Sequence, residues 1–208
     1  MSYGFNFRLF YDNIQPIITM EKRHRIFIAI NLPEEIKKEL AKYEGKWPEV
    51  PAKWIPKDNL HITLEFLGDL TDIEIGDACQ IVNEIAKNHK PFTINLHKVL
   101  YGPLAKNPPK MIWVEGEKSE ELTDLKNDLQ KGLLEKVRFK PDEKLFSPHI
   151  TLARILEWEF KKIDPEEIPE ISEEIGLTFS AESIEVMESE MKKGGPRYTV
   201  LESHILGE

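Results

Sequence analysis

Apolar and polar residues alternate over several short stretches of this chain, with the period of two that is typical of β-strands. This alternation predicts strands over residues 25–30, 60–66, 92–100, 111–114, 149–154, 177–186 and 198–206. Helical periodicity predicts helices over residues 33–46, 72–88 and 119–137, the last of them capped by Ser119. The acidic segment 165–176 predicts only a short helix or a solvated loop.

The same order of elements occurs twice, and each copy ends in the tetrapeptide His-Ile-Thr-Leu. The first copy runs from Arg25 to His61 over 36 positions, and the second from Met111 to His149 over 38 positions. Two strand–helix–strand units of matched length that end in the same four residues are typical of an internal duplication.

Composition limits the class of protein. The 208 residues are 40% hydrophobic and 31% charged, which suits one large domain or two small joined lobes. No apolar run is long enough to span a bilayer. The single cysteine, Cys79, cannot form an internal disulfide, so we expect a reducing, cytoplasmic environment and a packed thiol rather than a nucleophile.

The net charge of −9 argues against indiscriminate binding to nucleic-acid backbones. The acidity is local, however. Residues 157–190 alone carry a balance of −10, so the rest of the chain is close to neutral, at about +1. A phosphate-binding pocket outside the acidic segment is therefore compatible with the sequence.

The repeated tetrapeptide carries the candidate chemistry. Residues two apart on a strand share one face, so His61 and Thr63 point to one side, as do His149 and Thr151. One histidine suits proton transfer from an attacking water, and the other suits proton transfer to a leaving oxygen. The threonine hydroxyls suit the non-bridging oxygens of a phosphate. Two histidines acting on one phosphorus should lie roughly 5–8 Å apart.

Other kinds of site fit the sequence less well. The two motif histidines lack a third ligand at standard zinc spacing, so we expect no metal and no cofactor. The glycines at 194 and 195 predict a turn rather than a nucleotide-binding loop. We expect surface or packing roles for the histidines that lack a threonine two residues later, namely His24, His89, His97 and His204.

Four segments in this order resemble the RNA 2′,3′-cyclic phosphodiesterase family, also called 2′–5′ RNA ligases, within the two-histidine phosphoesterases. They are residues 25–33, 59–68, 147–154 and 194–198, which contain both tetrapeptides. The resemblance implies one bilobal α+β domain over residues 20–208, in which antiparallel sheets of two pseudo-symmetric lobes flank a central cleft and helices cover the outer faces. Residues 1–19 have no counterpart in the family and predict an extension outside the catalytic domain.

The resemblance also implies residue roles. His61 corresponds to the proton donor of the family and His149 to the proton acceptor. Arg154 corresponds to an arginine after the second motif that binds the phosphate, although strict alternation places it opposite His149, so that it needs a bend to reach the site. Lys110 stands where an arginine is expected in a loop that contacts RNA.

Three functions compete. The leading hypothesis is hydrolysis of a 2′,3′-cyclic phosphate, on RNA ends or a cyclic nucleotide, to a 2′-phosphomonoester by a monomeric enzyme. The same residues used in reverse would join tRNA halves through a 2′–5′ linkage. A module that binds RNA without turnover is the third, with Trp54 and Tyr198 available to stack on bases. For Trp54 and Trp113, core packing is the favoured role. Both motifs are intact, which favours an enzyme.

Overall fold

The computed structural model describes residues 21–103, 106–142, 145–193 and 195–208. The expected extension at residues 1–19 lies outside the described residues. The strands are β1 (His24–Asn31), β2 (Ala52–Trp54), β3 (His61–Leu70), β4 (Phe92–Gly102), β5 (Met111–Gly116), β6 (His149–Ile155), β7 (Ser172–Ala181), β8 (Ser183–Lys192) and β9 (Gly195–Ile205). The helices are α1 (Glu34–Ala41), the 3-10 helix η1 (Lys57–Asn59), α2 (Asp72–Asn88), α3 (Glu120–Lys136) and α4 (Glu157–Phe160).

The strands form one antiparallel sheet in the order β7-β4-β5-β6-β3-β1-β8-β9, with β2 paired to β6. This order divides into two four-stranded halves that meet where Ile62 of β3 pairs with Ile150 of β6. In each half, the strand that begins with the motif histidine lies beside the first strand of its unit, β3 beside β1 and β6 beside β5. The α+β fold with duplicated antiparallel halves is therefore confirmed, although the two halves form one continuous sheet.

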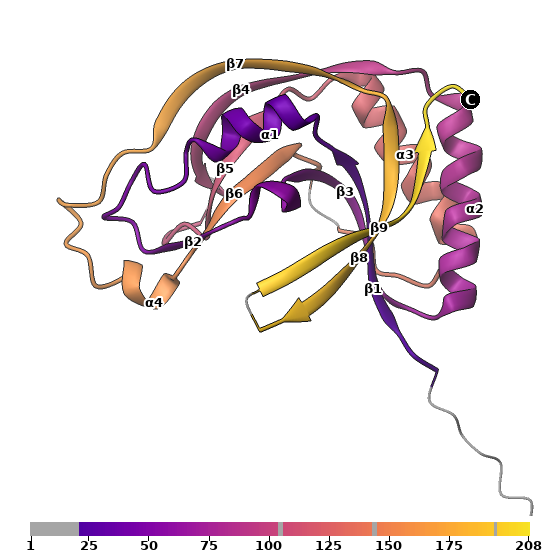
Figure 1. Cartoon of the computed structure of the whole chain (residues 1–208), viewed down its shortest axis with the longest axis horizontal. Coiled ribbons are helices and arrows are strands. Elements are labelled where there is room, and N and C mark those ends of the chain that lie inside the picture. The colour runs from indigo at the N-terminus through magenta and orange to yellow at the C-terminus, as the bar shows by residue number, and fades with distance from the viewer. Residues whose placement is uncertain (1–20, 104–105, 143–144, 194) are drawn as a thin grey trace, which may run out of the picture.

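The helix of each unit packs against the other half. The helix α1 follows β1, but its C-terminal side is linked to β7 by a hydrogen bond of 2.9 Å from the Tyr43 hydroxyl to Glu173. The helix α3 follows β5, but its Lys126 pairs with Glu65 of β3 at 2.6 Å. Figure 1 shows α2 and α3 beside the half that contains β1, β8 and β9. These contacts across the sheet join the two halves.

The main core lies between the sheet and the helices. It contains the apolar residues of the strand faces and helix stripes, including Ile28, Ile62, Leu125 and Ile150. The helices α2 and α3 approach closely at Gly132, where a Cβ would lie 2.9 Å from the side chain of Ile85. A small second cluster, formed by Phe27, Ala29 and Met187 with Tyr198 against it, covers the opposite face of the sheet.

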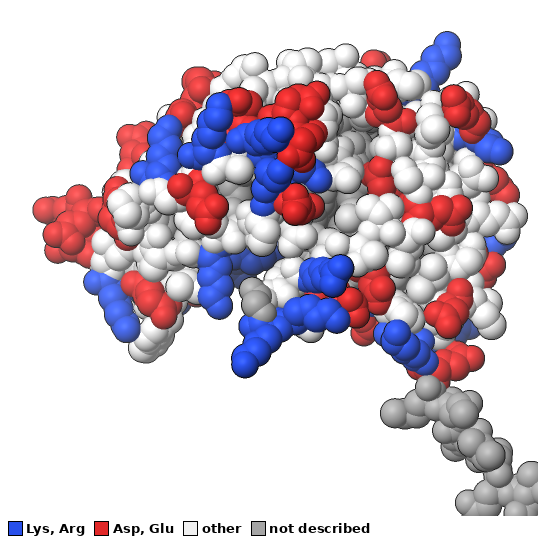
Figure 2. Space-filling view, viewed as in Figure 1, with Lys and Arg blue, Asp and Glu red and all other residues white. Residues whose placement is uncertain are grey.

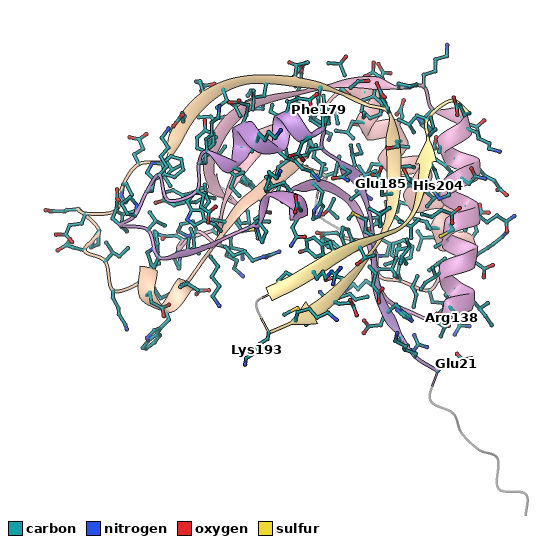
Figure 3. All side chains as sticks on the ribbon, in the orientation of Figure 1. Glu21, Arg138, Phe179, Glu185, Lys193 and His204 are labelled. Atoms are coloured by element: carbon teal, nitrogen blue, oxygen red, sulfur yellow. The ribbon has the colours of Figure 1, made fainter. Side chains whose placement is uncertain are left out.

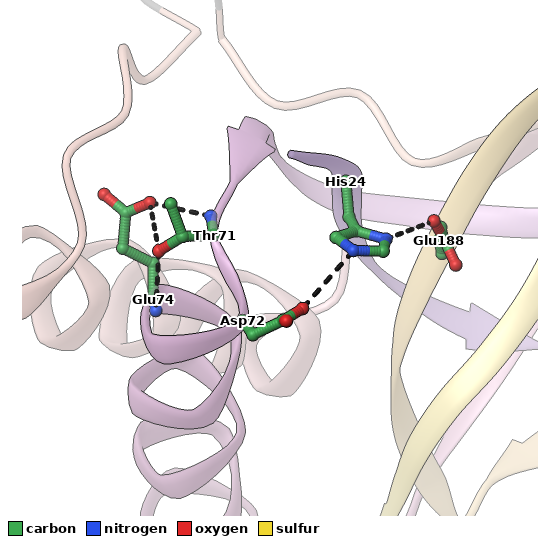
Figure 4. Close-up of polar contacts among 5 residues, drawn as sticks. All are labelled: His24, Thr71, Asp72, Glu74 and Glu188. Atoms are coloured by element: carbon green, nitrogen blue, oxygen red, sulfur yellow. Dashed lines mark hydrogen bonds and ion pairs between the residues drawn. The ribbon is translucent and has the colours of Figure 1, made fainter. Parts of the chain in front are cut away.

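Two helix starts follow the sequence signals closely. Thr71 accepts a hydrogen bond from the backbone of Glu74, and the Glu74 carboxylate accepts one from the backbone of Thr71, so that a complete capping box begins α2 (Figure 4). Ser119 caps α3, as predicted. None of the described helices is both long and apolar enough to cross a membrane.

Three predicted elements were wrong in extent. The first helix ends at Ala41 rather than near 46, because the chain turns at Gly45 with a positive φ of 73°. The expected single strand over 177–186 is two strands, β7 and β8, which separate at Glu182. β7 begins at Ser172, inside the segment 165–176 that was expected to be a short helix or a solvated loop. Along β7, partly or fully buried positions alternate with exposed ones. Several of these positions carry acidic residues, so the sequence does not show the alternation of apolar and polar residues.

Candidate active site

The two motif histidines lie on neighbouring strands. Because Ile62 pairs with Ile150 in an antiparallel register, His61 lies beside Thr151, and His149 lies beside Thr63. The two isoleucines face the main core, so these four side chains are on the opposite face of the sheet. The two histidines are then diagonal neighbours, a relationship that places two residues about 7–8 Å apart in regular pairing, with their β-carbons somewhat closer. The structure thus brings both predicted histidines and both predicted threonines to one place on the sheet.

Each motif contains a β-bulge at its fourth residue. In β6, Thr151 pairs with Trp113 and Ala153 pairs with Ile112, so Leu152 is the extra residue. In β3, Leu64 is the extra residue between two paired positions in the same way. A bulge reverses the alternation of faces that follows it. The two motifs therefore share a β-bulge at the same position as well as the same sequence.

The bulge brings Arg154 to the histidine face. Leu152 and Ala153 are both buried in the core, and Arg154 is exposed on the other side. The alternation rule, which placed Arg154 opposite His149, was therefore wrong because it assumed a regular strand. In the first half, Phe66 occupies the position equivalent to Arg154 and is exposed. The two halves thus present different side chains at this position.

The backbone fixes both imidazole rings in one orientation. His61 Nδ1 lies 2.7 Å from the carbonyl oxygen of Asn59, and His149 Nδ1 lies 2.8 Å from that of Ser147. A carbonyl only accepts hydrogen bonds, so Nδ1 carries the proton in each ring. Nε2 is then the atom that gains or loses a proton, and it does so at the same position in both halves.

The two threonines have different partners. Thr63 Oγ1 lies 3.0 Å from Nε2 of His61, and it donates to that nitrogen when the ring is neutral. Thr151 Oγ1 instead donates to the sulfur of Met111 at 3.6 Å. A thioether is a weak acceptor, so the Thr151 hydroxyl can exchange this contact for a phosphate oxygen at little cost.

Burial keeps both histidines neutral in the free protein. The pKa of His61 is lowered to about 4, mainly by desolvation; the hydrogen bond to the Asn59 carbonyl opposes this shift, and the positive charges of Lys37 and Arg154 add to it. Desolvation also lowers the pKa of His149, and Arg154 contributes in the same direction. An anion bound beside these rings would stabilise the imidazolium form and raise both pKa values.

Aromatic rings enclose each imidazole. Phe27 and Tyr198 lie 5.0 and 5.2 Å from the His61 ring, between centroids, and the indole of Trp113 lies 4.2 Å from the His149 ring. Trp113 is buried, as the favoured core role required, but it also packs on His149. Sequence reasoning missed Phe27 and this second contact of Trp113. The contact of Phe27 depends on strand register, because Phe27 is two residues from Ala29, which pairs with Thr63.

The other predicted site residues are placed differently. Tyr198 is brought to His61, and the carbonyl of Pro196, on the same strand, accepts a hydrogen bond of 2.9 Å from the Asn59 side chain. Trp54 stacks on Trp47 and packs against the main core, as its favoured core role predicted. Lys110 is exposed and directly precedes β5.

Comparison with known proteins identifies the class. The family model described as "LigT like Phosphoesterase" matches the chain twice, over residues 30–113 and 112–198, so that each match contains one His-Ile-Thr-Leu motif. The chain belongs to this family. A relative from Thermus thermophilus named RNA 2′,3′-cyclic phosphodiesterase is 32% identical over 188 residues, which are 88% of this chain and 90% of that protein.

Further relatives agree. A protein of the same name from Aquifex aeolicus is 29% identical over 160 residues, 76% of this chain and 84% of that protein. Among solved structures, TT0787 of Thermus thermophilus matches with a TM-score of 0.75 at 32% identity and covers 88% of this chain and 98% of its own. LigT of E. coli, in its apo form, has the same fold with a TM-score of 0.70 at 24% identity and covers 90% of this chain and 99% of its own.

Proposed function

We propose that this protein is an RNA 2′,3′-cyclic phosphodiesterase that opens a terminal cyclic phosphate to a 2′-phosphomonoester without a metal. The observation that carries the proposal is the matched presentation of two imidazoles: each donates from Nδ1 to a backbone carbonyl and offers Nε2 on the same face of two paired strands. The curated relatives that carry this name cover most of the chain.

In the proposed reaction, His149 Nε2 takes a proton from water as the water oxygen attacks phosphorus. The bond from phosphorus to the 3′ oxygen breaks, and His61 Nε2 gives its proton to that oxygen. The assignment of donor and acceptor follows the family, because the two histidines are held alike. His61 is neutral in the free protein, so the bound phosphodiester anion must raise its pKa before it can act as the acid.

Thr63, Thr151 and Arg154 hold the phosphate in this proposal. Arg154 supplies a permanent positive charge and several donors, which suit the non-bridging oxygens. Its influence on the pKa of both histidines supports a position near both rings. The hydroxyls of Thr63, beside His61 Nε2, and of Thr151, on the same face, would orient the same oxygens.

RNA contacts would extend from the histidines toward the β8–β9 hairpin. Tyr198 is available to stack on a base, and the exposed Lys110 would meet the RNA backbone. Trp54 is the weakest candidate, since its ring already stacks on Trp47. Figure 2 shows Lys and Arg side chains gathered along the lower edge of the molecule, where Figure 3 labels Lys193 at the hairpin. Acidic side chains form a group at the left-hand end and are also spread over the upper and right-hand parts of this face.

One chain supplies both histidines, so we also propose that the enzyme works as a monomer. Residues 20–208 would form its single domain, and we infer a cytoplasmic location from the RNA substrate and the single cysteine.

The test is an assay of purified protein on an RNA that ends in a 2′,3′-cyclic phosphate, with EDTA present and the product's phosphate position determined. We expect a 2′-phosphate. Addition of an RNA with a free 5′-hydroxyl tests 2′–5′ ligation, which should remain minor because bulk water competes for the cyclic phosphate. Tight binding without conversion would favour the binding module, and a 3′-phosphate product would contradict the assigned leaving group.

A further inference from the structure

A pocket of about 590 Å³ lies on the face of the sheet opposite the histidines of the candidate active site. Its walls come from α2 and from β8 and β9, and they include His24, Asp72, Cys79, Glu188 and Glu202. Glu188 is paired with Ile26, which faces the main core, whereas Phe27 faces His61. The proposed cyclic phosphodiesterase reaction uses none of these five residues.

At one end of the pocket, the polar side chains already have partners. His24 Nδ1 lies 2.6 Å from Glu188, and its Nε2 lies 3.3 Å from Asp72, so that both ring nitrogens face a carboxylate (Figure 4). An ion at this end would have to displace one of these partners. This end of the pocket therefore serves as an internal comparison for the other.

At the other end, the Cys79 thiol is hydrogen-bonded to Glu202, and the buried ring of His204 lies beside this pair. Cys79 Sγ, a carboxylate oxygen of Glu202 and a ring nitrogen of His204 all lie within 4.8 Å of one another. The His204 side chain is only 4% exposed, and its Nε2 has no hydrogen-bond partner in the part of the chain that the structure describes. The nearby oxygen of Glu202 is 3.9 Å away, too far for a hydrogen bond. An unpaired buried nitrogen is costly, so its retention points to a ligand.

We propose that Cys79, Glu202 and His204 bind one Zn²⁺ ion. Thiolate, imidazole and carboxylate are the three kinds of protein ligand that zinc takes. Bonds of about 2.0–2.3 Å in a tetrahedron place ligand atoms roughly 3.3–3.8 Å apart, so a small inward movement of these side chains completes the geometry. Water from the open pocket fills the fourth position.

The ion would fasten α2 to the last strand. Cys79 comes from the middle of α2, while Glu202 and His204 are two positions apart on β9 and share a face. Zinc binds the thiolate form of cysteine, so the Cys79 proton passes to solvent as the sulfur–zinc bond forms. Because the site lies across the sheet from His61 and His149, the ion is structural rather than catalytic.

The test uses untagged full-length protein that has been stripped with chelator, freed of it and kept reduced. Calorimetric titration with ZnCl₂ should show one site per chain, and Co²⁺ should give the charge-transfer absorption of a thiolate ligand. Because the chain has one cysteine, alkylation by iodoacetamide reports on Cys79 alone, and Zn²⁺ should slow it. Zn²⁺ should also raise the thermal midpoint, since it binds the folded state.

Two conservative variants and one control decide the proposal. Cys79→Ser and Glu202→Gln should each weaken Zn²⁺ binding by about tenfold or more, because each removes one ligand of the ion. Glu188→Gln, at the satisfied end of the pocket, should bind Zn²⁺ as the native protein does. Cys79→Ser should retain cyclic phosphodiesterase activity. Absence of one-to-one binding, or native affinity in either ligand variant, would overturn the site without touching the proposed function.

Discussion

Arg154 lies on the same face of β6 as His149, although an odd number of positions separates them. The bulge at Leu152 produces this relationship, because two successive residues, Leu152 and Ala153, both enter the core. A permanent positive charge thereby comes close enough to lower the pKa of both histidines. This position is the basis for the proposal that Arg154 binds the phosphate beside the two imidazoles.

Replacement of Arg154 should therefore change both binding and titration. We expect Arg154→Ala to lower kcat/KM about 10- to 100-fold, the value of one lost charge-assisted hydrogen bond of roughly 1.5–3 kcal/mol. The pKa of both histidines should rise, which imidazole NMR titration can measure. Lys136→Ala, at an exposed position near the end of α3, is the control and should leave all of these values unchanged. Unaltered histidine titration in Arg154→Ala would contradict the placement.

Gly102 should be sensitive to the smallest substitution. A Cβ on Gly102 would lie 2.2 Å from the nearest indole atom of Trp113, which packs on His149. We expect Gly102→Ala to destabilise the fold by about 1–3 kcal/mol through overpacking and to lower activity by moving Trp113.

Gly76→Ala is the matched control, because no atom lies within 4 Å of its Cβ position in α2. It should stabilise by about 0.5–1 kcal/mol, as alanine does in a helix. Urea unfolding measures both changes. Equal effects of the two substitutions on the free energy of unfolding would show that the Trp113 indole does not pack directly against Gly102.

The fold was predictable wherever a segment carried its own local signal. The helices at 72–88 and 119–137 agree closely with α2 and α3, because caps and periodicity occur together there. The first residues of β7 were missed because acidic residues mask the alternation there, and the strand is stabilised by pairing with distant β4.

The site was predictable in part for the same reason. The repeated tetrapeptide marks the histidines, and strand periodicity places His61 with Thr63 on one face. The position of Arg154 was not predictable, because the residues around Leu152 do not indicate a bulge. Nor does the sequence show that Phe27 and Trp113 pack on the two imidazoles, since these contacts depend on strand register.

Protonation of His61 should make the protein less stable in mild acid. The unfolded chain binds a proton at the ordinary pKa of 6.5, while the folded chain resists it until about pH 4. Stability should therefore fall as the pH decreases from about 6.5 toward 4, and His61 should contribute no pH dependence above that window. The lowered pKa of His149 acts in the same direction.

Urea unfolding at several pH values, native against His61→Gln, isolates this contribution from that of the carboxylates. The variant should lose less stability between pH 7 and pH 5 than the native protein, because the group that resists protonation is gone. Parallel pH profiles would contradict the lowered pKa of His61.

The buried pair of Lys126 and Glu65 should be costly to break. Their side chains are 10% and 2% exposed, and Nζ lies 2.6 Å from the carboxylate. Lys126→Met leaves Glu65 charged and unpaired, so we expect a loss of about 3–5 kcal/mol in the free energy of unfolding. Replacement of both residues, Lys126→Met with Glu65→Leu, should recover most of it.

Lys42→Met is the matched control, since its partner Glu39 is solvent-exposed and the pair should contribute less than about 1 kcal/mol. A small effect of Lys126→Met, similar to that of the control, would show that Glu65 does not depend on this partner.

The most direct test of the central claim is the turnover of a 2′,3′-cyclic nucleotide by His61→Ala and by His149→Ala in the presence of EDTA. Each variant should lower kcat by about 10²–10⁴, the contribution of one general acid or base, and the double variant should lose less than the product of both effects. His89→Ala, whose ring pairs with Asp128 beyond the end of α2, should retain native turnover. Native turnover in either motif variant would contradict the paired-histidine account.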